Sequence, residues 1–289
     1  MPPGFVAEFW MKFTDMKIAF SFLFALITSC TNGKEIIYIG STPANNVVKT
    51  FLGIPLADSV DFIKWKLVFG ENRYRLNCQY GIGKQNTNGF INGGKRIELN
   101  GILKKDGNYY HLESGNRKLT MIAWNVNLIH PVDKNNNPLI GTGGFAYTLS
   151  IEKPLLTDEV NLISKQNALK DSMTFVGRTP CGEFSINRTG PNCNKLKWKI
   201  VLYADPRTHE PTTYLLNRSS MIPLEYPGKT GTWKIITGKD GRIIYELKPD
   251  HEIIPTFLLK LDENILVFTD SKGNLLVGDG DFSFTLSRE

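Results

Sequence analysis

The stretches YIGSTPA, residues 38–44, and FVGRTPC, residues 175–181, follow one pattern. Each has an aromatic residue, a β-branched residue, glycine and a polar residue, followed by threonine, proline and a small residue. The two copies lie 137 positions apart, and the second ends in Cys181 where the first has Ala44. Because internal repeats decide an architecture before other features are considered, this recurrence indicates a duplicated unit.

Two further blocks repeat in the same order. Residues 63–69, IKWKLVF, match residues 196–202, LKWKIVL, and the 24 residues from Asn127 match those from Asn264 with ten identities. The repeat is longer than the roughly 20–50 residues of solenoid units, so we expect each copy to be a domain with its own core. The sequence predicts a first repeat over residues 36–150, a linker over 151–172 and a second repeat over 173–289.

Both copies have the pattern of β-strands. Within residues 63–69 and again within 196–202, apolar and polar side chains alternate with a period of two, which buries one face of a strand. Similar short runs recur between turn signals such as KDGN at 105–108 and SKGN at 271–274. About seven or eight strands per copy are enough to close a sheet. We therefore expect an all-β fold of two tandem small antiparallel β-barrels, joined by a partly helical linker whose helix begins near Thr157.

The N-terminal region has the features of a bacterial lipoprotein signal. An apolar run at residues 18–27 is too short to span a bilayer and has the length of a signal-peptide core. It leads into LITSC, residues 26–30, which resembles a lipobox. We predict that residues 1–29 are a signal peptide, with 1–15 an over-extended start, and that Cys30 is lipidated on a tether of residues 30–35. Because Thr31 is not an aspartate, we expect an outer-membrane location in the bacterial cell envelope.

The second copy also resembles a known family. It has an apolar-Gly-x-x-Pro-Cys opening at residues 176–181, a strand with Trp198, a GTW strand ending at Trp233, an Asp-x-x-Gly turn at 270–273 and a final aromatic-Thr-Leu strand. This order is similar to the NlpE-type domain of envelope lipoproteins. The resemblance implies lipocalin-like barrels and a link to copper homeostasis and envelope-stress sensing. The family's second cysteine is replaced by Phe184, so only Cys181 matches its Cys-x-x-Cys motif.

The remaining cysteines suggest a crosslink. Cys181 and Cys193 enclose a short segment of the second copy, and in an oxidising envelope the first expectation is a disulfide. The alternative is a metal site with two thiolates, although no histidine or third cysteine lies nearby in sequence. Cys78 falls in a strand pattern, which favours a buried thiol. The segment of the first copy that corresponds to the crosslinked one is apolar and is expected to form a short packed helix.

The repeat motifs are expected to be structural. Their residues are Gly40, Pro43 and Trp65 in the first copy, and Gly177, Pro180, Trp198 and Trp233 in the second. The four histidines are scattered, and we find no GxSxG or HExxH motif and no recognisable carboxylate dyad. The sequence thus predicts no catalytic residues, no metal ligands and no cofactor, and the protein is expected not to be an enzyme.

The charge pattern narrows the possible partners. The formal net charge is +6, but Lys and Arg form no run of the kind that binds nucleic acid. We predict a non-catalytic binding or sensing module that meets the membrane through its lipid and binds a small apolar ligand or an envelope protein. The alternatives are a structural or interaction lipoprotein with filled barrels, or copper handling through the second repeat.

Overall fold

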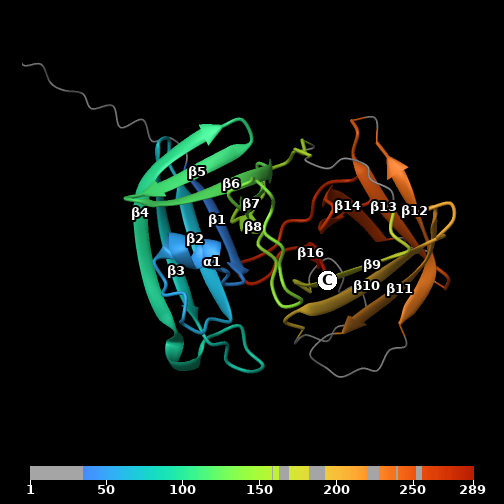
Figure 1. The fold of residues 1–289 in the computed structure, drawn as a ribbon, viewed down its shortest axis with the longest axis horizontal. Coiled ribbons are helices and arrows are strands. Elements are labelled where there is room, and N and C mark those ends of the chain that lie inside the picture. Colours follow the sequence, from blue (N-terminus) through green and yellow to red (C-terminus); the bar gives the residue numbers. More distant parts are fainter. Residues whose placement is uncertain are drawn as a thin grey trace, which may run out of the picture. The chain divides into compact units, whose positions relative to one another are not determined.

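The chain folds into two closed antiparallel barrels of eight strands each, one after the other (Figure 1). The computed structural model describes residues 35–157, 159–162, 169–181, 193–219, 228–238, 240–251 and 256–289. Cys30, Phe184 and the predicted signal peptide and tether up to residue 34 lie outside these residues. The predicted fold class of two tandem antiparallel barrels is confirmed.

The first barrel contains β1 (Ile36–Thr42), β2 (Phe62–Phe69), β3 (Arg73–Gly81), β4 (Lys95–Asp106), β5 (Tyr109–Ser114), β6 (Arg117–Asn125), β7 (Leu128–Val132) and β8 (Leu149–Ile151). The second contains β9 (Ser172–Thr179), β10 (Leu196–Ala204), β11 (Pro211–Ser219), β12 (Lys229–Thr237), β13 (Ile243–Pro249), β14 (Thr256–Asp262), β15 (Ile265–Thr269) and β16 (Thr285–Arg288). Neighbours in sequence pair in space, and each barrel closes where its last strand pairs with its first, β8 with β1 and β16 with β9. Closure leaves no open sheet edge to pair with another chain.

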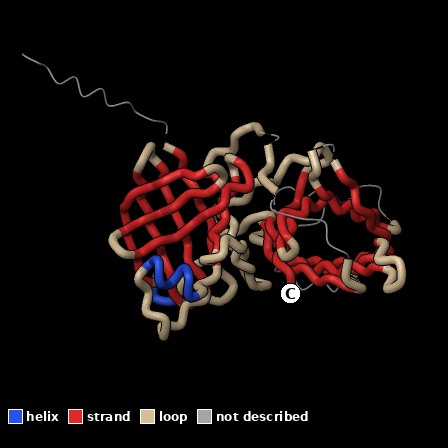
Figure 2. Tube along the Cα trace, turned by 45° about the horizontal axis from the view of Figure 1, so that its top comes forward, coloured by secondary structure: helices blue, strands red, loops and turns tan. Residues whose placement is uncertain are grey.

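Two helical elements accompany the first barrel, the α-helix α1 (Asn46–Leu52) and the 3-10 turn η1 (Ile91–Gly93). Helix α1 is the short packed helix expected from the sequence, and it lies at one end of the barrel (Figure 2). The Asn45 side chain accepts a hydrogen bond from the Val48 amide at 3.0 Å and so caps the first turn. Val48, Phe51 and Leu52 are buried in the same apolar cluster as the barrel interior.

The inside of the first barrel is occupied by large side chains. Strand β3 alternates exposed and buried residues along its length, as a half-buried strand must. The buried set contains aromatic residues from several strands, including Tyr38, Trp65, Phe69, Tyr74 and Tyr80. A separate cluster with Phe175, Trp198, Trp233 and Phe268 forms the core of the second barrel. Each copy therefore has its own core.

The glycine and tryptophan of the repeated motif face each other across neighbouring strands. Gly40 pairs with Trp65 between β1 and β2, and Gly177 pairs with Trp198 between β9 and β10. A Cβ on Gly177 would lie 2.8 Å from a Leu286 side-chain carbon, closer than real contacts allow. The missing side chain therefore lets the closing strand approach, which accounts for the glycine at this position in both copies.

The threonine and proline of the motif complete the same contact. The indole nitrogen of Trp65 donates to Thr42 Oγ1 at 2.8 Å, and that hydroxyl donates to the Pro43 carbonyl at 3.1 Å. Trp198, Thr179 and the Pro180 carbonyl repeat these two bonds with the same distances. Proline lacks an amide hydrogen for the sheet, and both first strands end just before it. The recurring pattern is therefore a buried hydrogen-bonded corner of each barrel.

The predicted helix of the linker between the barrels is not seen in its described residues. Its described residues between β8 and β9, residues 152–157, 159–162 and 169–171, contain no helix. The rest of the predicted helix lies outside the described residues. Residues 33–289 group as a single compact unit, so the linker does not separate the barrels into independent bodies. Within the part of the chain that the structure describes, no helix is both long and apolar enough to cross a bilayer.

Candidate binding site between the two barrels

Residues that correspond in the two repeats meet where the barrels touch. The amide of Gly141 donates to Ser287 Oγ, and the amide of Gly278, its counterpart, donates to Ser150 Oγ, both at 3.0 Å. The hydroxyls of Thr148 and Thr285, another corresponding pair, lie 3.0 Å apart. Such a reciprocal set of contacts is the signature of an isologous interface, in which the same patch is used by both partners. Here both partners belong to one chain.

Apolar residues form a second part of this interface. One buried cluster joins Ile122, Trp124, Leu128 and Val132 of the first barrel to Leu259, Leu261, Ile265, Val267 and Leu275 of the second. The corresponding rings of Phe145 and Phe282 stack with centroids 5.7 Å apart, and Phe62 stacks on Phe145 at 4.7 Å. A buried apolar cluster of this size holds the two barrels in a defined arrangement.

One difference between the two halves of the interface lies at positions 41 and 178. Ser41 Oγ of the first barrel donates to the Gly280 carbonyl of the second at 3.1 Å. Its counterpart in the second barrel is Arg178, the one position at which the motif changes from a small polar to a large charged residue. The serine half is thus tied directly to the opposite barrel, whereas the arginine half carries a cation.

A second difference lies beside the first. Lys64 of β2 forms an ion pair with Asp281 of the second barrel at 2.5 Å. By the repeat, Lys64 corresponds to Lys197 and Asp281 corresponds to Gly144. The carboxylate that neutralises the lysine in one half is therefore missing from the other half.

A cleft of about 710 Å³ lies at this interface and includes Gly144 and Lys197, the positions without the carboxylate, in its walls. Both barrels contribute to its walls, which are formed by residues 61–62, 83–88, 142 and 144–145 of the first barrel and by Arg178, Lys195, Lys197 and Ser219 of the second. Its volume lies within the range of about 300–1,000 Å³ typical of small-molecule sites. The walls combine amide and hydroxyl groups, the Phe62 and Phe145 rings and several cations.

Arg178 is the central cation of this cleft. Its Cζ lies 5.6 Å from the centroid of the Phe145 ring, so the guanidinium is held against an aromatic face. Its Nε is buried and has no hydrogen-bond partner among the described residues. Burial lowers the pKa of the guanidinium, which nevertheless stays protonated because arginine does not lose its proton in proteins.

Lys195 lies next to it and corresponds to Phe62 of the first barrel. Only 8% of Lys195 is exposed, and its Nζ lies 5.6 Å from the centroid of the Phe282 ring. Burial lowers the pKa of the ammonium, and the charges of Arg178 and Lys197 lower it further, whereas Asp281 acts in the opposite direction. Among the described residues neither Lys195 nor Arg178 forms an ion pair with a carboxylate.

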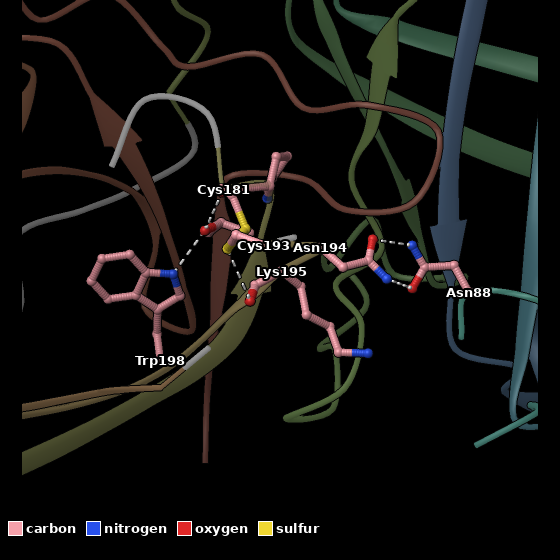
Figure 3. The surroundings of a disulfide bond; sticks show 8 residues. Asn88, Cys181, Cys193, Asn194, Lys195 and Trp198 are labelled. Atoms are coloured by element: carbon pink, nitrogen blue, oxygen red, sulfur yellow. Dashed lines mark hydrogen bonds between the residues drawn. A yellow bond between two sulfur atoms is a disulfide. The ribbon is translucent and has the colours of Figure 1, made fainter. Parts of the chain in front are cut away.

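The disulfide braces the segment just before β10, which contains Lys195. Cys181 and Cys193 are bonded, with Cα atoms 6.0 Å apart, which confirms the predicted pair over a thiolate metal site. Figure 3 shows the disulfide beside Trp198, and Asn194 between Cys193 and Lys195. The Asn194 and Asn88 side chains exchange two hydrogen bonds of 2.9 and 3.2 Å from one barrel to the other (Figure 3). Lys195 is thus held between a crosslink and a polar bridge.

The predicted structural residues lie in the barrels rather than in the cleft walls. Gly40, Trp65, Gly177 and Trp198 form the corners described above, and the indole nitrogen of Trp233 donates to the Tyr203 carbonyl at 2.7 Å. Cys78 is a buried free thiol, as expected. The prediction missed Arg178, Lys195 and Gly144 as site residues. The signal was present in the aligned repeats, because each of the three replaces a residue of different charge or size in the other copy.

The described residues contain no group of three or more His, Cys, Asp or Glu side chains that could hold a metal ion. His130 is fully buried between Thr148 Oγ1 at 3.0 Å and the Leu139 carbonyl at 2.8 Å. Comparison with known proteins adds no further assignment, because no family model, no curated protein and no solved structure matches this chain.

Proposed function

We propose that this chain is a non-catalytic binding lipoprotein of the bacterial cell envelope that holds a small ligand in the cleft between its two barrels. The cleft is the observation that carries the proposal. It has the volume of a small-molecule site, it is walled by both barrels, and its walls present donors, acceptors and aromatic faces. The likeness of the second repeat to NlpE-type domains supports an envelope role.

The position of the ligand differs from the interior pocket of a typical lipocalin-like barrel. The interior of the first barrel is occupied by buried aromatic side chains, and the Val48, Phe51 and Leu52 side chains of helix α1 join this cluster from one end. A tandem arrangement supplies a second kind of concave surface, at the junction of the barrels, and such junctions are preferred places for ligand sites. The proposal therefore places the ligand outside the barrel lumen.

The anchor part of the proposal rests on the LITSC sequence ending at Cys30. Metabolic labelling with palmitate of bacteria that express the full chain tests it, followed by separation of inner and outer membranes. We expect label in the outer-membrane fraction for the wild type, no label for Cys30→Ala and full label for Cys78→Ala. Label that survives in Cys30→Ala would remove the anchor from the proposal.

The binding part is tested on the full chain, extracted from those membranes in mild detergent. Native mass spectrometry is expected to show a bound mass that is lost when the protein is denatured. The mass of the protein without any bound small molecule in every preparation would contradict a binding role.

A filled first barrel also favours a second candidate, a structural lipoprotein whose surface binds an envelope protein. This role predicts a chain with no bound small molecule. It also predicts that the chain co-purifies with one protein after crosslinking in intact cells. The two candidates therefore give opposite results in the same mass measurement.

A further inference from the structure

We infer that the cleft binds an oxyanion, the carboxylate or phosphate group of a small molecule, with Arg178 and Lys195 as the residues that hold it. This inference rests on the proposed function, because it names the chemical class of the ligand in that cleft.

The cleft carries more positive than negative charge. Its lining residues include Lys84, Arg178, Lys195 and Lys197, against the single carboxylate of Asp61. That carboxylate accepts a hydrogen bond from the Gly83 amide at 2.7 Å. The cleft walls therefore carry a net positive charge.

The next carboxylate is already engaged. Asp281 binds Lys64 through one oxygen at 2.5 Å and the Asn88 amide through the other at 2.8 Å. It acts on Lys195 as a nearby charge, but both of its oxygens have other partners. Asp281 is thus satisfied by Lys64 and by Asn88 at the cleft wall, which leaves the cleft cations to an external anion.

The Lys195 ammonium and part of the Arg178 guanidinium are withdrawn from water. Removing a charge from water is unfavourable unless a partner of opposite charge or a set of hydrogen bonds replaces the water. Lys195 is 8% exposed, and Arg178 Nε is buried without an acceptor among the described residues. Aromatic rings 5.6 Å away compensate only part of this cost. A bound oxyanion would supply the acceptors, and the planar guanidinium suits a carboxylate or phosphate in particular.

The other half of the interface serves as an internal comparison. There Asp281 provides the anion for Lys64, and at the corresponding place Gly144 provides nothing. A Cβ built on Gly144 would lie 3.8 Å from Arg178 Cζ and Nη1, an ordinary contact distance. A side chain fits at this position, and an aspartate would bring its carboxylate to the guanidinium. In the variant Gly144→Asp, the new carboxylate should therefore take the place of the bound anion.

The test compares Gly144→Asp with the matched neutral variant Gly144→Asn in the full chain. Calorimetric titrations with inorganic phosphate and with citrate distinguish a phosphate site from a carboxylate site. We expect saturable binding of at least one probe to the wild type and to Gly144→Asn. Gly144→Asp and Arg178→Gln should bind it at least tenfold more weakly, and Arg207→Gln, which removes an exposed cation outside the cleft, should bind it as the wild type does.

Native mass spectrometry of the same proteins distinguishes failure of the oxyanion site from failure of the binding role. A bound mass in the wild type and Gly144→Asn that is absent from Gly144→Asp supports the oxyanion site. Equal occupancy of Gly144→Asp and Gly144→Asn, or no saturable binding of either probe by a protein that carries a bound mass, would overturn the oxyanion inference and leave the binding role intact. No bound mass and no probe binding in any variant would overturn both.

Discussion

The two barrels stabilise the segment after the Thr-Pro corner in different ways. After the Thr-Pro corner the first barrel continues into helix α1, which buries Val48, Phe51 and Leu52 in its core. At the same point the second barrel has Cys181, which is bonded to Cys193 just before the tryptophan strand. The helix stabilises the native state by apolar burial, whereas in the loop-entropy account a crosslink acts by restricting the unfolded chain. A duplicated unit can therefore keep its corner and replace the element that secures it.

The largest expected effect tests what the barrels share. Trp65→Ala and Trp198→Ala each remove a buried indole and its hydrogen bond to a threonine, and each should cost about 3–5 kcal/mol of unfolding free energy. Urea unfolding measures the loss, and hydrogen exchange read separately over residues 36–151 and 172–219 assigns it to a barrel. The exposed Leu56→Ala should cost less than about 0.5 kcal/mol. A loss in only one of the tryptophan variants would show that the corners are not equivalent.

The next effect is specific to the second barrel. Replacing both Cys181 and Cys193 by serine opens a crosslink across 12 residues, which the loop-entropy relation values at about 3 kcal/mol. Faster hydrogen exchange is expected chiefly in β9 and β10, with little change in β2 and β3. The matched control is Cys78→Ser under the same conditions, whose effect belongs to the first barrel. Equal changes in both barrels would argue against a local role for the disulfide.

A pH effect of intermediate size belongs to the first barrel. Burial lowers the pKa of His130 from 6.5 to about 4, partly offset by its bond to the Leu139 carbonyl. Between these two values the unfolded chain binds a proton that the folded chain does not, so stability rises with pH and is lost as pH falls from about 6.5 toward 4. The loss between pH 7 and pH 4.5 should be roughly 2–3 kcal/mol.

The second copy supplies the control for that effect. Val267 corresponds to His130, so His130→Val makes the first barrel resemble the second at this position. Urea midpoints at pH 7 and pH 4.5 should differ less in His130→Val than in the wild type. The same pH dependence in both proteins would assign it to other groups.

The smallest expected effect concerns the helix that distinguishes the first barrel. Asn45→Ala removes the cap on the Val48 amide and should cost about 1 kcal/mol. Asn45→Asp keeps a capping oxygen and should stay within a few tenths of a kcal/mol of the wild type. Thermal unfolding followed by circular dichroism measures both, and equal losses in the two variants would show that capping is not the cause.

The aligned repeats predicted the barrels because strand alternation and turns are local properties of a sequence. They did not predict the corner between Tyr74 and Gly101, repeated by Tyr214 and Gly231. In both copies a Cβ on the glycine would collide with a carbonyl of the next strand and with the tyrosine ring. These contacts depend on which residues lie opposite each other on neighbouring strands, so only the register of the folded sheet reveals them.

The cleft was not predicted either, although the aligned repeats differ in charge or size at Arg178, Lys195 and Gly144. Arg178 stands inside the most recognisable motif of the chain, yet nothing in a single copy indicates that this position faces the other barrel. Its role depends on the interface, and the interface depends on Phe145, Thr148 and their counterparts meeting about a common axis. The apolar side chains of that cluster read in sequence as ordinary core residues.

The reciprocal contacts between the copies have a consequence for how such a protein can change. In a dimer of identical subunits every substitution at a two-fold interface arises twice, once on each side of the axis. Here a substitution at position 41 or at position 178 changes one side of the interface alone. Ser41 can therefore keep its hydrogen bond to the opposite barrel while position 178 carries a different residue. Joining the copies in one polypeptide thus lets one side of the interface hold the barrels together while the other side binds a ligand, which a symmetric dimer of identical subunits cannot do.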